Sequence, residues 1–411
     1  EDLARFGPAL EREGFSASVS TPSDLASGDV EADAEVAVLD LRDVPGSAVG
    51  LLVATLAERG ATATLFIVAS KSFSTGETLL NARTALAWLT GALGEGADIS
   101  RHFVAISNNV AAARDFGIMA DVIFPMPEWV GGRFSVWSAI GLPLMLAFGT
   151  DAFDEFLAGG RSMDAHFASA PFATNLPVLA ALLGIWNATF LGIDSHAMLP
   201  YSHRLRSLPA YLQQLEMESN GKSVDRSGKP VSWQTAPIIF GGPGTVGQHA
   251  YHQLFYQGTR KVAFDFVVPV CSTASPAALS LIDNALAQSA ALMLGRTLGE
   301  ARDELRARGL DENEIERLAP HLVCPGDQPS TTLLMPALTP FSVGQLLALY
   351  EHKVFVQGWI WGINRFDQNR FDQYGVELGK KMARSIENGA NAKRDGSTLG
   401  LLAATTAMSG A

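Results

Sequence analysis

The sequence has few cysteines and few basic residues. Cys271 and Cys324 are the two cysteines among 411 residues. Two thiols cannot form the disulfide framework of a chain this long, so we expect a reducing compartment, the cytoplasm. Lys and Arg total 30 against 42 acidic residues, a net charge of −12, and no basic cluster exceeds a dipeptide. Nucleic-acid binding is not expected, because it needs clustered cations.

Long apolar runs and metal-ligand spacings are also missing. The most apolar stretch, residues 178–193, contains Asn187 and Thr189 and is too short to span a bilayer. We expect no membrane association and assign Val178–Trp186 to a core helix that is apolar on nearly all sides. No His-x-x-x-His or Cys-x-x-Cys spacing occurs, and His352 lacks a paired ligand. The sequence predicts no metal and no cofactor.

What the sequence does have is an alternation of buried-type strands and helices. With 47% apolar residues, a chain of 411 residues can bury two domains. Continuous apolar runs separated by helical patterns are typical of parallel strands covered on both faces. The predicted fold is α/β, with mainly parallel, doubly wound sheets. Strands are expected at 36–41, 64–69, 102–107, 121–124, 237–240, 262–270 and 354–363.

Three stretches contain residues suited to chemistry. Residues 70–75, Ser-Lys-Ser-Phe-Ser-Thr, lie between a strand and a helix, where hydroxyls, free N–H groups and the Lys71 ammonium favour a phosphate. Taken alone, such a run is more often a capping segment. Gly131 and Gly132 let the backbone approach a ligand that Arg133 can reach. Glu218, which precedes Ser-Asn-Gly, should lie at the C-terminal edge of a helix and border a pocket.

Three motifs give the chain a family resemblance. They read Met-Glu-Ser-Asn-Gly-Lys at 217–222, Gly-Pro-Gly-Thr-Val-Gly-Gln-His at 242–249 and Trp-Val-Gly-Gly-Arg-Phe-Ser-Val-Trp-Ser at 129–138. From about Thr64 to the C-terminus the sequence resembles the glucose-6-phosphate isomerase family. His249 follows Glu218 by 31 residues, which matches the family spacing. A lone histidine is more often structural, but here the surrounding motif favours a functional one.

The resemblance implies two three-layer α/β/α sandwich domains of the sugar isomerase type, the first incomplete at its N-terminus. It implies interconversion of glucose 6-phosphate and fructose 6-phosphate, in glycolysis and gluconeogenesis, by a homodimer whose histidine comes from the neighbouring subunit. Glu218 would move a proton between C2 and C1 through an enediolate that Arg133 stabilises. His249 and Lys380 would open the sugar ring. The implied substrate ligands are Ser70, Lys71, Ser72, Thr75, Glu77, Gln214 and Gln373.

The same comparison suggests domain boundaries and two departures from the family. We expect an unmatched segment at 1–62, a small sugar-isomerase domain at 63–150, a large one at 151–375, and a C-terminal helix and tail at 376–411. The first segment lacks the family's Gly-x-Gly-Gly-Ser loop, and its start at Glu1 predicts a fragment or processed chain. An unrelated interaction or receiver-like piece is the alternative for residues 1–62. Gly242 and Val246 stand where many relatives have Glu and Asn.

A repeat near the C-terminus is a further irregularity. Asn364–Gln368 recurs at once as Asn369–Gln373, and the second copy fits the family pattern. Five residues added inside a helix would turn it by about 140° and remove Lys380 from the pocket. Because loops accept insertions more readily, we expect the first copy to form a loop and Lys380 to keep its place. A sugar-phosphate-binding protein with weak or lost activity is the alternative function.

The helix that follows the repeat has an apolar side. We expect it to start near Asp372 and to bury Leu378, Met382 and Ile386, which recur at helical spacing.

Overall fold

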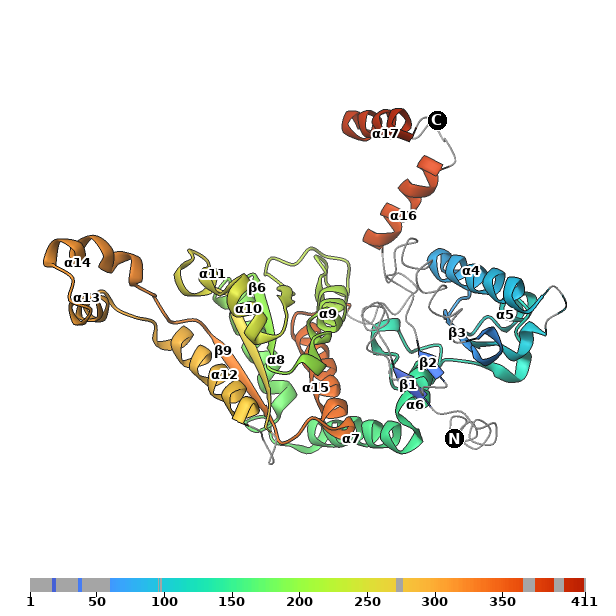
Figure 1. Cartoon of the computed structure of the whole chain (residues 1–411), viewed down its shortest axis with the longest axis horizontal. Coiled ribbons are helices and arrows are strands. Elements are labelled where there is room, and N and C mark those ends of the chain that lie inside the picture. Colours follow the sequence, from blue (N-terminus) through green and yellow to red (C-terminus); the bar gives the residue numbers. More distant parts are fainter. Residues whose placement is uncertain are drawn as a thin grey trace. The chain divides into compact units, whose positions relative to one another are not determined.

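The computed structural model describes residues 17–19, 36–38, 60–94, 96, 98–270, 276–364, 374–387 and 395–409. The chain divides into two compact units, Glu1–Arg365 and Phe366–Ala411, and each is described by itself. Figure 1 shows the elements of both.

The first sheet of the larger unit is parallel, as predicted. Its described strands are β3 (Phe66–Ala69), β4 (Phe103–Ile106) and β5 (Ile123–Phe124), in that order across the sheet. Every residue of β4 is buried. Strands are therefore present at the apolar runs 64–69, 102–107 and 121–124, as predicted. Each predicted run is longer than the strand observed.

Apolar side chains cover this sheet on both faces. On one face, Phe103 and Ala105 pack with Leu89 of α4 (Gly76–Leu93) and Ala113 of α5 (Val110–Asp115). On the other, the alternate residues Val104 and Ile106 pack with the segment that leads into α6. Since successive side chains of a strand point to opposite faces, the sheet is the middle layer of three.

The second sheet is also parallel. The described strands follow the order β7 (Ile238–Gly241), β6 (Ser195–Pro200), β8 (Ala263–Pro269) and β9 (Ser330–Met335). Met198 and Val267 pack toward α9 (Leu208–Leu212) and α15 (Pro340–Ile360). Their neighbours Leu199 and Phe266 pack toward α11 (His252–Gln257) and α12 (Pro276–Leu294). This sheet too is covered by helices on both faces (Figure 1).

Except for the last two, which belong to the smaller unit, the remaining described elements connect or flank these layers of the larger one. They are β1 (Ala17–Val19), β2 (Val36–Val38), η2 (Ala61–Ala63), η3 (Ile99–Arg101), η4 (Ala120–Val122), η5 (Gly132–Phe134), η6 (Ala139–Gly141), α6 (Leu142–Phe148), α7 (Thr150–Ser169), α8 (Leu176–Ile185), η7 (Trp186–Phe190), η8 (His203–Leu205), η9 (Gln213–Glu218), α10 (Gly244–Ala250), α13 (Leu298–Ala307), α14 (Glu312–Leu318), η10 (Ala319–Leu322), α16 (Tyr374–Glu387) and α17 (Gly396–Ser409).

The strand predicted at 354–363 is wrong, because α15 is one helix to Ile360. A capping box of Thr339 and Ser342 starts it. The β-branched and aromatic residues after Lys353 resemble a strand in sequence. In the structure, Tyr350, Val354 and Gln357 share a buried face at helical spacing. Tertiary packing of α15 against α7 and α8 overrides the local preference.

The helix at 178–186 is likewise not buried all round. Leu182 and Leu183 of α8 are 46% and 49% exposed, and Trp186 at the start of the π-helical turn η7 is 54% exposed. Ala181 and Ile185 face the core. The sequence could not separate the two faces, because both are apolar.

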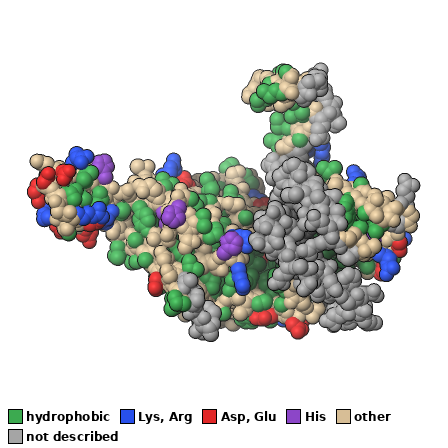
Figure 2. Space-filling view, viewed as in Figure 1, with side chains coloured by type: hydrophobic (Ala, Val, Ile, Leu, Met, Phe, Trp, Pro, Cys, Tyr) green, Lys and Arg blue, Asp and Glu red, His purple; other side chains and the backbone are tan. Residues whose placement is uncertain are grey.

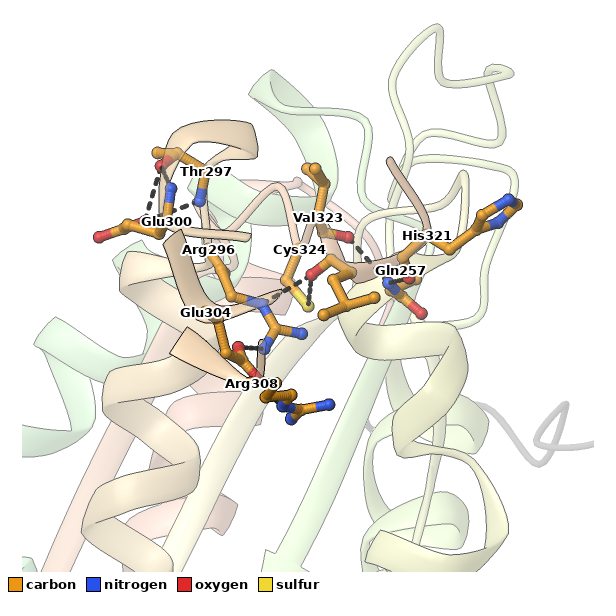
Figure 3. Close-up of polar contacts among 10 residues, drawn as sticks. Gln257, Arg296, Thr297, Glu300, Glu304, Arg308, His321, Val323 and Cys324 are labelled. Carbon is orange, nitrogen blue, oxygen red and sulfur yellow. Dashed lines mark hydrogen bonds and ion pairs between the residues drawn. The ribbon is translucent and has the colours of Figure 1, made fainter. Parts of the chain in front are cut away.

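Helices α13 and α14 form a charged hairpin inserted between α12 and β9. Acidic and basic side chains gather on it (Figure 2), and its own small core contains Leu305 and Ile315. At its base, Arg296 donates from Nε to Leu322 O (2.7 Å), while Gln257 Nε2 donates to the carbonyls of His321 and Val323 (Figure 3).

The N-terminal predictions fall largely outside the described residues. Of residues 1–59, the structure describes β1 and β2, which pair in parallel, and the expected strand at 36–41 is present over Val36–Val38. In the smaller unit, α16 begins at Tyr374. Within this unit Leu378, Met382 and Ile386 are exposed. Their burial against the rest of the chain stays a prediction.

A bilayer-spanning helix is not present in the described part of the chain, where every helix is too short or too polar.

Candidate active site

The loop after β3 presents hydroxyl groups at the start of a long helix. Ser70 is buried and its N–H donates to Ile106 O (3.0 Å), while Ser72 and Thr75 are exposed. Thr75 is the N-cap residue of α4, yet its side chain does not cap the helix within the described structure. Glu77 lies exposed in the first turn. The strand-loop-helix arrangement expected for an anion site is therefore present.

Buried Phe73 gives this loop a defined shape. Its φ of 49° is unusual for a residue with a side chain. Residues after β4 hold the loop from the other side, because Asn108 N–H donates to Lys71 O (2.9 Å) and Asn109 Nδ2 to Ser72 O (3.1 Å). These two asparagines were missed by the sequence analysis.

Lys71 links this loop to the glycine-rich segment that contains Arg133. Its Nζ donates to the carbonyls of Glu128 (2.7 Å) and Val130 (2.8 Å). An ammonium group has three N–H donors, so these carbonyls use two of them, counting the described partners. Lys71 thus has a structural contact that the sequence did not predict, in addition to the phosphate role proposed for it.

Arg133 and Glu218 meet, although 85 residues separate them in sequence. Arg133 Nη1 donates to Glu218 Oε1 (2.8 Å), and Nε donates to Ser219 Oγ (2.7 Å). The Arg133 side chain is 3% exposed and the Glu218 side chain 21% exposed. Such charge-assisted bonds fix the orientation of a carboxylate that solvent and small molecules can still reach.

Glu218 lies at the end of η9, a π-helical segment. Wide π turns are rare and occur frequently at functional sites. The helical run ends at Asn220, the Gly221 N–H donates to Met217 O (2.9 Å), and Lys222 Nζ donates to Glu218 O (2.7 Å). The prediction that Glu218 lies at a helix C-terminal edge is confirmed. Gln214 is exposed, one turn earlier on η9.

His249, Gln373 and Lys380 are not brought to Glu218 by any described contact. His249 is exposed on α10 and forms no hydrogen bond or ion pair within the described structure. Gln373 lies outside the described residues. The backbone of Lys380 lies in α16 of the smaller unit, and its side chain is not described. The roles of these three residues stay predictions.

Two further groups of polar side chains were not predicted. Glu216 Oε2 accepts from Lys353 Nζ (2.7 Å), and both side chains are at most 2% exposed. Glu351 accepts hydrogen bonds from Trp137 Nε1 and Tyr211 OH, and it lines a cavity of about 540 Å³ together with Asp164. Burial, with a further contribution from Asp164, raises the pKa of Glu351 to about 7.

One member of each group lies in the stretch Tyr350-Glu351-His352-Lys353, in which the sequence analysis considered His352 alone, and only as a metal ligand. His352 Nε2 instead contacts Asp164 Oδ1 (2.7 Å). Among the described residues, no three His, Cys, Asp or Glu side chains gather as a metal site would require.

The fold and the site together define an α/β protein of the sugar isomerase type, in which a guanidinium from the segment that follows the first sheet orients a carboxylate that lies between strands β6 and β7 of the second. The family model of phosphoglucose isomerase matches residues 32–402. A glucose-6-phosphate isomerase of Aromatoleum aromaticum is 62% identical over 353 residues, which are 86% of this chain and 64% of that protein. One of Pseudomonas fluorescens is 54% identical over 82% of this chain and 62% of its own length.

Solved structures agree. The crystal structure of a glucose-6-phosphate isomerase from Chlamydia trachomatis gives a TM-score of 0.77 at 32% identity, covering 99% of this chain and 76% of that chain. A hypothetical protein from Thermus thermophilus gives 0.69 at 26% identity, covering 94% and 87%. The chain belongs to the phosphoglucose isomerase family, and it spans less than two thirds of the length of the two curated relatives named above.

Proposed function

We propose that this chain carries the catalytic machinery of a glucose-6-phosphate isomerase, which interconverts glucose 6-phosphate and fructose 6-phosphate in glycolysis and gluconeogenesis. The observation that carries the proposal is the Arg133–Glu218 contact at 2.8 Å, at the end of a π-helical segment. Membership of the phosphoglucose isomerase family supports the substrate assignment.

In the proposed reaction, Glu218 transfers a proton within the open-chain sugar. Its carboxylate removes the proton at C2, the electrons of that C–H bond form the C1–C2 double bond, and the π electrons of the C1 carbonyl move to O1, which gives an enediolate. The same carboxyl then returns the proton at C1, while the hydroxyl proton passes from O2 to O1 and the C2 carbonyl forms. One group can serve both steps when it is positioned next to both carbons. Arg133 orients Glu218, and its positive charge stabilises the negative charge that develops on the enediolate oxygens. Gln214 orients the substrate hydroxyls.

The loop of residues 70–75 is the proposed phosphate site. Exposed Ser72 and Thr75 present hydroxyls where α4 begins, and Lys71 adds a positive charge. Ser70 and Glu77 complete the proposed ligand set. Lys71 also binds the backbone just before Arg133, so the phosphate site and the reacting carboxylate are joined by one short stretch of chain.

Ring opening needs a further acid and base, and we assign these roles to His249 and Lys380, with Gln373 as a substrate ligand. His249 is exposed and without a described partner in the single chain, which supports its use by a second subunit. We therefore propose a homodimer, located in the cytoplasm. Exposed apolar side chains on α8, η7 and the end of α15 support such an interface, notably Trp186, Phe190 and Trp359.

The direct test is a coupled assay for fructose 6-phosphate formation from glucose 6-phosphate. We expect turnover by the purified chain, and a rise in melting temperature when either sugar phosphate is added. Stabilisation without turnover would identify a binding protein instead. Neither turnover nor stabilisation would contradict the proposed function.

A further inference from the structure

Behind Glu218 lies a cluster of four buried polar residues, Glu216, Asn220, Lys353 and Gln357, here called the rear cluster. Glu216 and Asn220 come from the helical run of η9, and Lys353 and Gln357 from α15. Lys353 Nζ donates to Glu216 Oε2 (2.7 Å). Asn220 Nδ2 donates to Val354 O (3.2 Å) and to Gln357 Oε1 (3.4 Å). None of the four side chains belongs to the proposed reaction.

Stability does not explain this cluster. Removing two charges from water costs several kcal/mol per ion, and apolar replacements of buried ion pairs are often neutral or stabilising. Three further polar atoms here have no hydrogen-bond partner among the described residues, namely Glu216 Oε1, Asn220 Oδ1 and Gln357 Nε2. Leaving such atoms unsatisfied in the core is unfavourable. Because the cluster is energetically unfavourable, we expect it to have a role other than stabilising the fold.

Its geometry indicates what that role is. Residues two apart on a helix point to nearly opposite faces, so Glu216 faces α15 while Glu218 faces Arg133. Glu216 and Asn220 are four apart and hold the rear face at both ends. Gly184 lets α8 pack closely against the Gln357 side chain of α15, because a Cβ at position 184 would lie 2.3 Å from Gln357 Nε2.

The π-helical form of η9 makes such support necessary. A π turn contains one residue more than an α turn, and isolated π segments are rare because they are less favourable. Reversion to α geometry would remove one residue from the turn and rotate Glu218 by about 100° away from its present direction. Contacts that fix the rear face therefore also fix the direction of the catalytic carboxylate.

We propose that the Glu216–Lys353 ion pair, with Asn220 and Gln357, is a positioning device that holds η9 in its π-helical form and so aims Glu218 at the sugar carbons. This inference rests on the proposed function for its kinetic consequence. The structural consequence, a locked η9, does not depend on activity.

The experiment replaces the pair by apolar side chains of similar size, Glu216→Leu with Lys353→Met. The double variant leaves no unpaired buried charge, so we expect it to fold with a melting temperature near that of the native chain. We expect kcat for glucose 6-phosphate to fall by about 10- to 100-fold with KM changed by less than about twofold, because a misplaced Glu218 slows chemistry without weakening phosphate binding. An unchanged kcat would overturn the proposal.

The control removes an exposed ion pair of the charged hairpin, Arg302→Met with Glu316→Leu, which should leave kcat and KM unchanged. Should the buried double variant not fold, Lys353→Arg is the second probe, since it keeps the charge but alters its reach. A lowered kcat at constant KM supports the positioning role. Native kcat in Lys353→Arg contradicts it.

Hydrogen exchange separates this inference from the proposed function. In the double variant, amides of residues 213–220 should exchange at least about tenfold faster than in the native chain, while those of β8 are unchanged. This result is expected even if the native chain shows no isomerase turnover, in which case only the proposed function fails. Unchanged exchange across 213–220 would refute the positioning role whatever the activity.

Discussion

Lys71 combines two tasks at the residue scale. It is a charge beside the proposed phosphate site, and it binds the carbonyls of Glu128 and Val130. A phosphate is remote from the reacting carbons, so contacts to it stabilise substrate and transition state equally. We therefore expect residues of the loop to act mainly on affinity.

Thr75→Ala and Lys71→Ala test this expectation. Each should raise KM for both sugar phosphates by similar factors, about tenfold for loss of one charge-assisted bond, with little change in kcat. Lys71→Ala should also lower the free energy of unfolding, because it releases the segment before Arg133. Steady-state kinetics in both directions provide the measurement. A fall in kcat at constant KM would contradict the phosphate assignment.

Glu351 gives a prediction for pH. Its pKa is raised by burial to about 7 from an ordinary value of 4.5, so the folded state binds its proton more tightly than the unfolded chain does. The stabilisation is full below pH 4.5 and is lost as pH rises to about 7. At roughly 1.4 kcal/mol per pKa unit, the loss is about 3 kcal/mol.

Urea unfolding at pH 5 and pH 8 measures this effect. The difference in unfolding free energy between the two pH values should shrink by about that amount in Glu351→Gln, whose amide oxygen can still accept from Trp137 and Tyr211 but does not titrate. The exposed Glu155→Gln is the matched control on α7 and should behave as the native chain. If the unfolding free energy of Glu351→Gln depended on pH as that of the native chain does, the raised pKa of Glu351 would not be the cause of the pH dependence.

At the scale of elements, the predictions from the sequence were most accurate where one local pattern determines the secondary structure. The strands β4 and β8 are almost continuously buried runs, and such runs have few other solutions. α15 was divided wrongly, because Val354 and Phe355 favour strands locally while contacts with α7 and α8 decide. The π-helical form of η9 has no sequence signal that we used.

The same distinction between local patterns and long-range contacts applies to the site. Loop 70–75, Arg133 and Glu218 were predicted as site residues from contiguous motifs. The Glu216–Lys353 pair was not, because its members are 137 residues apart and neither occupies a motif. The contacts of Lys71 with Glu128 and Val130 could not be predicted either, because the acceptors are backbone carbonyls, which every residue has.

The five-residue repeat is tested at this scale. Buried Ile363 anchors the chain just before the repeat. Residues 365–373 lie outside the described residues, so the loop expected there from the sequence stays a prediction. Deleting Asn364–Gln368 should therefore leave kcat similar or improved, because closure entropy changes slowly with loop length. Lys380→Ala should lower kcat with or without the deletion. A deletion that abolishes folding, or a silent Lys380→Ala, would refute the assignment of Gln373 and Lys380.

For the whole molecule, the open question is whether two chains complete one site. We predict that mixing Glu218→Gln with His249→Ala, each inactive alone, restores activity after dissociation and reassembly. When the two variants reassemble at random, half of the dimers contain one chain of each variant, and such a hybrid dimer has one intact site out of two. The activity recovered should therefore be roughly a quarter of the native kcat. A site built within one chain would give no recovery, and sedimentation of each variant checks that both form dimers.

The central claim is that Glu218 carries the proton between C2 and C1. Glu218→Gln keeps an oxygen that can accept from Arg133 Nη1, so the geometry and sugar-phosphate binding should persist while the base is lost. The direct measurement is deuterium incorporation at C2 of glucose 6-phosphate in D₂O, followed by NMR. The native chain should exchange this position during turnover, and the variant should do so at least about 1,000-fold more slowly with unchanged affinity. Rapid exchange in Glu218→Gln would show that another group moves the proton.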